Sequence, residues 1–323
     1  MNTFQFWRVW PVLACLSLAV VAQQKSAQPS GSQPQPESTP ARRQQPAAAP
    51  RPWALPEGTR LLRDLEYVPS GHERHKLDLY LPEKGAGWPL LVWVHGGAWR
   101  GGSKDRCPVI PFLKEGYAVA SLNYRLSQHA IFPAQIEDCK AAIRWLRANA
   151  SKYNFDPERI EVWGSSAGGH LVALLGTAGD VPEFDKGENL AFSSRVQAVC
   201  DWFGPSDLLQ MSKFESRMDH DAPDSPESQL VGGPIQENKG KAAQANPITY
   251  VSKDDPPFLI MHGDQDPLVP FNQSELLHEA LKKAGVDVTF SPVKGGGHGQ
   301  PGWDAPEIRP VVREFFARTL KSP

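Results

Sequence analysis

The sequence predicts an α/β fold in which a mostly parallel sheet of eight strands is covered by helices on both faces. From residue 61 onward, short apolar runs alternate with segments whose apolar residues recur every three or four positions. This alternation indicates βαβ units and therefore parallel strands. Two strand-like runs precede the alternation, and they predict an antiparallel edge to the sheet.

The first half of the expected elements follows from local patterns. Residues 61–68 and 75–81 are predicted strands, and the second alternates apolar and polar positions. Residues 89–94 form a continuous apolar run, which is typical of a strand covered on both faces. A helix is expected over residues 105–115 and a strand over residues 117–123.

The clearest helix follows Pro133, a residue favoured in the first helical turn. Its apolar side chains Ile136, Cys139, Ile143 and Leu146 recur at helical spacing and define one buried face. The remaining elements are expected as strands over 160–163, 196–202, 257–261 and 287–293 and helices over 171–175, 272–283 and 306–319. The stretch 206–255 is polar and lacks periodicity, so we expect a short insertion over the end of the sheet that carries the site.

Residues 1–22 predict a secretory signal peptide. Arg8 supplies a positive charge, residues 9–19 are apolar, and residues 20–22 form a small-residue cleavage site. The apolar run is too short to span a bilayer comfortably. Cys15 allows the alternative of a lipoprotein anchor, but the apolar run continues past it, which favours a cleaved signal. We therefore expect a secreted or periplasmic protein with no membrane span after the signal is removed.

Residues 23–55, rich in Pro, Gln and Ala, have little to bury and are expected to be a disordered linker before a folded domain over 56–323. The net charge of −2 and the lack of a basic run argue against nucleic acid as a partner. Beyond the signal, the cysteines are Cys107, Cys139 and Cys200. Cys200 is expected to be a buried small hydrophobe, and a Cys107–Cys139 disulfide is left open.

One stretch organises the rest of the chain: Gly164-Ser165-Ser166-Ala167-Gly168 is a G-x-S-x-G centred on Ser166, between an expected strand and an expected helix. This is the pattern of a nucleophile elbow, whose strained turn requires small neighbours. Ser166 Oγ would stand above the sheet near a helix N-terminus, where negative charge is stabilised. Such a motif occurs by chance in roughly one chain in ten. Whether Ser166 is a nucleophile therefore depends on finding an acid, a base and oxyanion donors elsewhere in the chain.

The stretch His95-Gly96-Gly97-Ala98-Trp99 follows the buried strand that ends at Val94. Sites in open α/β sheets form at the carboxyl ends of strands. The backbone N–H groups of Gly96 and Gly97 could therefore form an oxyanion hole together with that of Ala167.

Two later loops supply the other partners. Asp264 and Asp266 follow the strand over 257–261, and either carboxylate could orient a histidine while the other closes the turn. His298 lies in a Gly-rich loop after the last strand and completes the order Ser, Asp, His. No cofactor and no metal are predicted, because the chain has no His-Glu-x-x-His, no paired-Cys motif and no Gly-x-Gly-x-x-Gly after a strand.

From about residue 61 to its end the chain resembles the α/β-hydrolase esterases, near the bifunctional feruloyl and acetyl-xylan esterases and the hormone-sensitive-lipase-like enzymes. The motifs that carry the resemblance are His95–Trp99, Asn123–Arg125, Phe132–Asp138, Gly164–His170, Asp201–Asp207 and His262–Asp266. The resemblance implies an α/β-hydrolase fold with Ser166 as nucleophile, Asp266 as acid and His298 as base. It further implies that Gly97 and Ala167 supply the main oxyanion N–H groups and that Asp138 and Asp207 are structural.

The resemblance also implies a serine carboxylic-ester hydrolase that works through an acyl-enzyme and removes acetyl or feruloyl groups from xylan or related oligosaccharides. Trp99, Tyr124 and Trp202 are the expected substrate contacts. A general short-chain carboxylesterase and a prolyl-oligopeptidase-like exopeptidase are the alternatives. A hydrolase-fold protein that binds a ligand without catalysis is disfavoured, because Ser, Asp and His are all present. The oligomeric state does not follow from the sequence.

Overall fold

The computed structural model describes residues 54–303 and 305–319. The predicted signal peptide over 1–22, with Cys15, lies outside the described residues. So does all but the end of the predicted linker over 23–55. Among the described helices, none is both long and apolar enough to cross a membrane.

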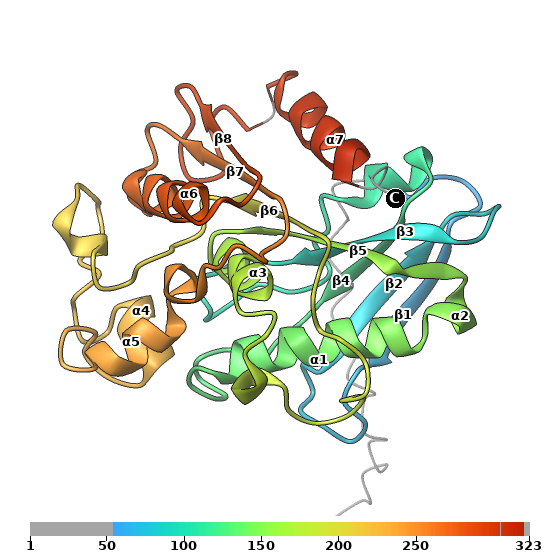
Figure 1. The fold of residues 1–323 in the computed structure, drawn as a ribbon, viewed down its shortest axis with the longest axis horizontal. Helices are drawn as coiled ribbons and strands as arrows, with labels where there is room; N and C mark the ends of the chain where they lie inside the picture. The colour runs from blue at the N-terminus through green and yellow to red at the C-terminus, as the bar shows by residue number, and fades with distance from the viewer. Residues whose placement is uncertain (1–53, 304, 320–323) are drawn as a thin grey trace, which may run out of the picture. The chain divides into compact units, whose positions relative to one another are not determined.

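Within the described residues, eight strands form one sheet in the order β1-β2-β4-β3-β5-β6-β7-β8 (Figure 1). The pairs β1–β2 and β2–β4 are antiparallel and all other pairs are parallel. The strands are β1 (Arg60–Glu66), β2 (Lys76–Leu81), β3 (Trp88–Val94), β4 (Ala118–Leu122), β5 (Phe155–Ser165), β6 (Ala198–Trp202), β7 (Phe258–Gly263) and β8 (Val288–Val293). The predicted fold class, with its antiparallel edge, is confirmed.

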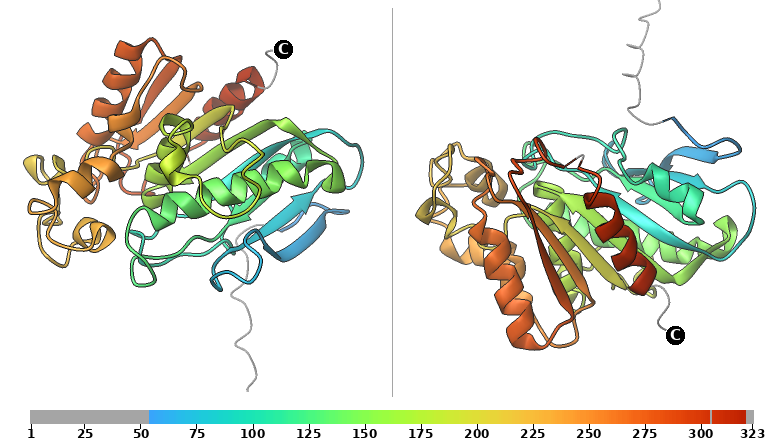
Figure 2. Two further views of the ribbon diagram at one scale, coloured as in Figure 1. Left: turned by 60° about the horizontal axis from the view of Figure 1, so that its bottom comes forward. Right: turned by 90° about the horizontal axis from the view of Figure 1, so that it is seen from above.

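Helices cover both faces of this sheet (Figure 2). On one face α1 (Ala134–Ala148), α3 (Ala167–Thr177) and α6 (Asn272–Ala284) contribute to one hydrophobic core. On the other face the 3-10 helix η1 (Ile110–Glu115) and α7 (Ile308–Thr319) contribute to a second core. The short helix α2 (Ala150–Tyr153) follows α1 directly.

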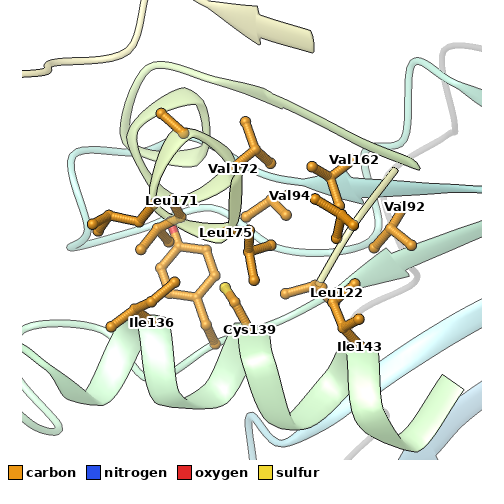
Figure 3. Close-up of a cluster of buried hydrophobic side chains, with 14 of the residues drawn as sticks. Val92, Val94, Leu122, Ile136, Cys139, Ile143, Val162, Leu171, Val172 and Leu175 are labelled. Atoms are coloured by element: carbon orange, nitrogen blue, oxygen red, sulfur yellow. The ribbon is translucent and has the colours of Figure 1, made fainter. Parts of the chain in front are cut away.

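The continuous apolar run of β3 divides its side chains between the two cores. Val92 and Val94 belong to the first core, whereas Leu91 and Trp93 belong to the second. Successive side chains of a strand point to opposite faces, so a strand covered on both sides must be apolar throughout. Figure 3 shows the first core, where the predicted apolar face of α1 and the side chains Leu171, Val172 and Leu175 of α3 meet the strands.

The cysteines answer a question that the sequence left open, because Cys107, Cys139 and Cys200 are all free and buried. Cys139 lies in the core beneath α1, and Cys107 lies in the core on the opposite face of the sheet. A Cys107–Cys139 disulfide, which the sequence left open, is not formed, since the sheet separates the two thiols. Cys200 is a fully buried member of the second core, as expected.

Two segments differ from the expected elements. The helix expected over 105–115 is only the 3-10 helix η1, because Pro108 and Pro111 remove backbone donors that a longer α-helix would use. The insertion over 206–255 holds four short helices, among which Figure 1 shows α4 and α5 side by side. These helices are η3 (Met211–Lys213), α4 (Pro226–Val231), α5 (Lys239–Ala245) and η4 (Pro247–Tyr250). Their buried side chains, Leu230 and Val231 among them, join the first core, so the insertion is packed onto the domain.

Candidate active site

Ser166 occupies a strained turn between β5 and α3. Its backbone has φ 55° and ψ −124°, a region that a residue other than glycine rarely adopts. The turn is held from both sides, because Ser166 N–H donates to the carbonyl of Trp202 (2.9 Å) and Ser166 C=O accepts from His170 N–H (2.9 Å). A Cβ added at Gly168 would lie 2.1 Å from the carbonyl oxygen of Val94. Glycine is therefore required there for α3 to approach β3.

The structure brings Ser166, His298 and Asp266 into one chain of hydrogen bonds. Ser166 Oγ lies 3.0 Å from His298 Nε2, and His298 Nδ1 lies 2.7 Å from Asp266 Oδ2. Ser166 follows β5, Asp266 follows β7 and His298 follows β8, so all three stand at the carboxyl edge of the parallel strands. With the proton on Nδ1, His298 donates to Asp266 and its Nε2 is free to accept the serine proton.

Asp266 has a hydrogen-bond partner on each oxygen. Its Oδ1 accepts from the backbone N–H groups of Leu268 (2.8 Å) and Val269 (3.0 Å), and its Oδ2 lies 3.2 Å from His262 Nε2. Burial alone would raise the pKa of Asp266, but its contacts with His262 and His298 outweigh burial and lower this pKa well below its usual range. The carboxylate therefore stays ionised.

The two candidate acids are separated by geometry. Asp264 is exposed, and its Oδ1 accepts from the backbone N–H of Gly295 (2.7 Å) in the loop that leads to His298. Asp266, and not Asp264, reaches the imidazole. Asp264 thus ties the loop after β7 to the loop after β8. The turn closure expected of one of the two side chains is made by Asp266, whose Oδ1 accepts from Leu268 and Val269.

The loop after β3 lies against the elbow. A Cβ added at Gly96 would meet Ser166 Cβ at 3.2 Å, and Gly97 has φ +116°, a conformation suited to glycine. Ala98, with φ 54°, and Ala167 both line the cavity at Ser166. Ala167 is the first residue of α3, so its N–H has no acceptor within the helix. Ala98 is a member of this site that the sequence did not single out.

Tyr124 supports this loop from behind. It is fully buried, its hydroxyl donates to the carbonyl of His95 (2.9 Å) and its ring stacks on the His95 ring at 4.5 Å. His95 Nδ1 in turn donates to the carbonyl of Gly96 (2.7 Å) and its Nε2 accepts from Arg74 Nη2 (3.1 Å). Burial lowers the pKa of His95 to about 4, which keeps it neutral. Because Tyr124 is fully buried behind this loop, the expectation that it contacts substrate is wrong.

The two tryptophans have different positions. Trp99 lines the cavity at Ser166 although it is only 2% exposed, and its indole N–H donates to His170 Nδ1 (3.2 Å). Trp202 is half-buried, packs against Trp163 and Trp303 beside the second core and does not line the cavity at Ser166, so its expected substrate contact is wrong. Its neighbour Phe203, which the sequence analysis missed, has its ring 4.6 Å from that of His298. Cys200 and Trp202 alternate with Val199 along β6 and face the second core, whereas Phe203, with φ 45°, follows the end of the strand.

The two aspartates expected to be structural hold loops together. Asp138 accepts from Arg125 Nη2 (2.7 Å) and contacts His75 Nε2 (3.0 Å). Asp207 accepts from Leu209 N–H (3.1 Å) and from the side-chain amide of Asn246 (2.8 Å). Neither lines the cavity at Ser166.

That cavity has a volume of about 70 Å³. Its walls come from the loop after β3, the elbow, the loops after β6, β7 and β8, and the insertion. The lining residues are Ala98, Trp99, Ser166, Ala167, Pro205, Met218, His220, Pro226, Glu227, Leu268, Val269 and His298. The four insertion residues were not identified from the sequence, because the polar stretch over 206–255 carries no motif.

Among the described residues, His72, Glu73 and His129 form a group whose potential ligand atoms lie within 4.8 Å of one another. His72 Nδ1 accepts from the N–H of Arg74 (3.2 Å), and His129 Nδ1 accepts from the N–H of Leu126 (3.2 Å). A neutral imidazole that binds a metal through Nε2 carries its proton on Nδ1. Each ring would therefore have to give up this hydrogen bond in order to bind a metal through Nε2.

Comparison with known proteins identifies the family to which the chain belongs. The BD-FAE family model matches residues 77–281. Esterase LipQ of Mycobacterium tuberculosis is 34% identical over 244 residues, which are 73% of this chain and 56% of LipQ. The chain thus spans about half the length of the curated relatives it matches.

Two solved structures are similar along most of the chain. A truncated form of a carbohydrate esterase from gut microbiota has a TM-score of 0.77 at 37% identity and covers 83% of this chain and 99% of its own. A bifunctional GH43-CE protein of Bacteroides eggerthii has a TM-score of 0.74 at 38% identity and covers 80% of this chain and 38% of its own. The chain belongs to the BD-FAE family and has the α/β-hydrolase fold of esterases.

Proposed function

We propose that the protein is a serine carboxylic-ester hydrolase that removes acetyl groups from xylan-type oligosaccharides. The observation that carries the proposal is the hydrogen-bonded chain from Ser166 through His298 to Asp266, beside backbone donors at a helix N-terminus. Curated relatives named as esterases and a solved structure named as a carbohydrate esterase support the reaction class and the kind of substrate.

In the proposed reaction, Ser166 Oγ attacks the ester carbonyl carbon while His298 Nε2 takes the serine proton. Asp266 stabilises the resulting imidazolium. The N–H groups of Gly97 and Ala167 stabilise the negative carbonyl oxygen. The carbon–oxygen bond to the alcohol then breaks, and His298 returns the proton to the leaving oxygen. Water attacks the acyl-enzyme in the same way, and this second step releases acetate and restores Ser166.

The small cavity supports a short acyl group. Pockets for drug-sized ligands have volumes of about 300–1,000 Å³, whereas the cavity at Ser166 has about 70 Å³. An acetyl group with the adjoining ester atoms is of the right size, whereas the aromatic ring of a feruloyl group would require the insertion to move. We therefore place acetyl ahead of feruloyl, although both belong to the proposed substrate range.

A second candidate function is a general short-chain carboxylesterase with no preference for sugars. It is favoured by the same small cavity, because a volume that fits an acetyl group does not by itself require a sugar as the alcohol. An exopeptidase is disfavoured, because we find no Glu-Glu pair to hold a substrate amine among the residues that line the cavity in the described part of the chain.

The substrate proposal is tested by comparing kcat/KM on acetylated xylo-oligosaccharide, methyl ferulate, p-nitrophenyl palmitate and Gly-Pro-p-nitroanilide. The acetylated oligosaccharide should be the best substrate and methyl ferulate weaker. A preference for the palmitate or the anilide would contradict the proposal. Equal rates on acetylated oligosaccharide and on simple alkyl acetates would favour the general carboxylesterase.

We further propose that the enzyme acts outside the cytoplasm after cleavage of residues 1–22. The support is the charge, apolar run and small-residue site described above. N-terminal sequencing of the protein from the extracellular or periplasmic fraction should begin near Gln23. A mature chain that begins at an acylated Cys15 would instead indicate a lipoprotein.

A further inference from the structure

A buried pair of ionisable side chains lies in the wall of the cavity that contains Ser166. His220 and Glu227, both from the insertion, are 1% and 3% exposed, and His220 Nδ1 lies 3.1 Å from Glu227 Oε1. His220 Nε2 also lies 3.0 Å from the carbonyl oxygen of Leu268, two residues after Asp266. The pair therefore connects the insertion to the loop that carries the acid.

Two atoms of this pair lack a hydrogen bond: His220 Nδ1, whose contact with Glu227 Oε1 is an ion-pair contact, and the second oxygen of Glu227. Glu227 Oε2 is inaccessible to solvent and has no hydrogen-bond partner in the described part of the chain. Buried polar atoms of native proteins are nearly always paired, and an unpaired one calls for an explanation such as a ligand or an ordered water. Glu227 lines the same cavity as Ser166 and His298, so a molecule bound for reaction could supply the missing donor.

The charge of the pair limits what that donor can be. Burial lowers the pKa of His220, but the contact with Glu227 outweighs burial and raises it, which favours the imidazolium. The His220 ring faces the Glu227 carboxyl group on one side and the Leu268 carbonyl oxygen on the other, so any charge on the ring is offset within the pair. Among the residues that line the cavity, His298 is the other titratable group, and it is paired with Asp266. A neutral O–H donor suits such a site better than a cation does.

We propose that Glu227 is a specificity-determining residue whose Oε2 accepts a hydrogen bond from a hydroxyl on the alcohol part of the substrate, beside the ester. In an acetylated sugar, the ring hydroxyl next to the acetylated carbon is such a group. His220 is a positioning residue that holds the carboxylate in place. The proposal rests on the proposed ester hydrolysis and deepens it, because it explains how the site distinguishes a sugar ester from a simple alkyl ester.

Two substrates of nearly equal size isolate this hydrogen bond. The alcohol part of 2-hydroxyethyl acetate carries a hydroxyl where propyl acetate carries a methyl group. The wild-type enzyme should have at least a tenfold higher kcat/KM on 2-hydroxyethyl acetate. Propyl acetate would leave the buried oxygen of Glu227 unpaired, and the cost of an unpaired buried polar group is what allows an enzyme to discriminate strongly against such an analogue.

Variants assign the preference to Glu227. The ratio of the two kcat/KM values should fall to about one in Glu227→Leu, whereas Glu227→Gln, which keeps an acceptor oxygen, should retain part of it. The matched control is Glu237→Leu, since Glu237 is an exposed residue of the same insertion. This control should keep the wild-type ratio.

Three outcomes would overturn the inference. The first is a wild-type ratio near one, which needs no variant and so does not depend on whether Glu227→Leu folds. The second is an unchanged ratio in a folded Glu227→Leu. The third is a preference for acetylcholine over 2-hydroxyethyl acetate that disappears in Glu227→Leu, which would assign the site to cations. Failure to hydrolyse any acetate ester would instead contradict the proposed function.

Discussion

The indole N–H of Trp99 donates to Nδ1 of His170, 3.2 Å away, and so joins the loop after β3 to the first turns of α3. His170 Nε2 lies 2.7 Å from the carbonyl oxygen of Ala245, at the end of α5 in the insertion. One neutral histidine therefore connects the loop with the proposed oxyanion donors, the helix behind the proposed nucleophile and the insertion that closes the cavity.

Trp99→Phe removes this hydrogen bond while it keeps most of the aromatic packing. Because a hydrogen bond contributes about 1 kcal/mol net, we expect kcat on p-nitrophenyl acetate to fall by about fivefold as the oxyanion loop loosens. The matched control is Trp88→Phe, which removes the bond from its indole to the carbonyl of Lys84 (3.3 Å) at the start of β3. An equal fall in kcat for the control would show that the effect is general destabilisation.

Substitution of one acid in the loop after β7 should reduce catalysis, and substitution of the other should reduce stability. Asp266→Asn should lower kcat by about 10⁴, because the imidazole loses the partner that fixes its tautomer and stabilises its charge. Asp264→Asn should lower the free energy of unfolding with a much smaller effect on kcat, because Asp264 holds the backbone of Gly295. Steady-state kinetics together with urea unfolding separate the two effects. Equal losses of kcat at matched stability would contradict the assignment.

Two buried histidines predict loss of stability in acid. Burial lowers the pKa of both His95 and His170 from 6.5 to about 4. Between these values the unfolded chain binds protons that the folded chain does not, so the free energy of unfolding should fall as the pH drops from 6.5 to 4. The loss could reach about 3 kcal/mol for each histidine.

Urea unfolding at several pH values checks this expectation in wild type and in His170→Gln. The variant should be less stable at pH 7 but should lose less stability on acidification. His278→Gln, at a partly exposed position on α6, is the control and should keep the wild-type dependence. A wild-type slope in His170→Gln would contradict the prediction.

Glu161 predicts the opposite dependence at higher pH. Burial raises its pKa from 4.5 to about 8, against a hydrogen bond from Thr319 Oγ1. The folded state therefore binds the proton more tightly than the unfolded state, and this contribution to stability is complete below 4.5 and is lost as the pH rises towards 8. Glu161→Gln should reduce the fall in stability between these values, as measured by thermal unfolding. Glu158→Gln, at an exposed position of the same strand, should not.

Much of the fold could be predicted because its signals are local. The apolar runs of β3 and β7 and the spaced apolar residues of α1 mark burial directly. Ser166, Asp266 and His298 could be predicted to form one site, because each follows a strand and the carboxyl ends of parallel strands share one edge of the sheet. The helix expected over 105–115 was too long because apolar spacing was weighted above the prolines at 108 and 111.

The rest depends on directions and contacts that spacing does not give. Trp202 and Phe203 are neighbours in sequence and both pack at the second core, but of the two it is Phe203 whose ring contacts that of His298. Tyr124 comes two residues after the end of β4, where a substrate contact was expected, but its side chain is buried behind the oxyanion loop. His220 and Glu227 reach the cavity through an irregular insertion, whose path is set by tertiary packing and not by any periodic pattern.

The proposed reaction requires that Ser166 become acylated during turnover. The most direct test is to inhibit the protein with a fluorophosphonate, digest it, and locate the adduct by mass spectrometry. We expect one adduct, on Ser166, formed in step with loss of esterase activity. We also expect no adduct in Ser166→Ala and normal labelling in Ser165→Ala. Labelling of Ser165, or full esterase activity in a folded Ser166→Ala, would contradict acylation of Ser166.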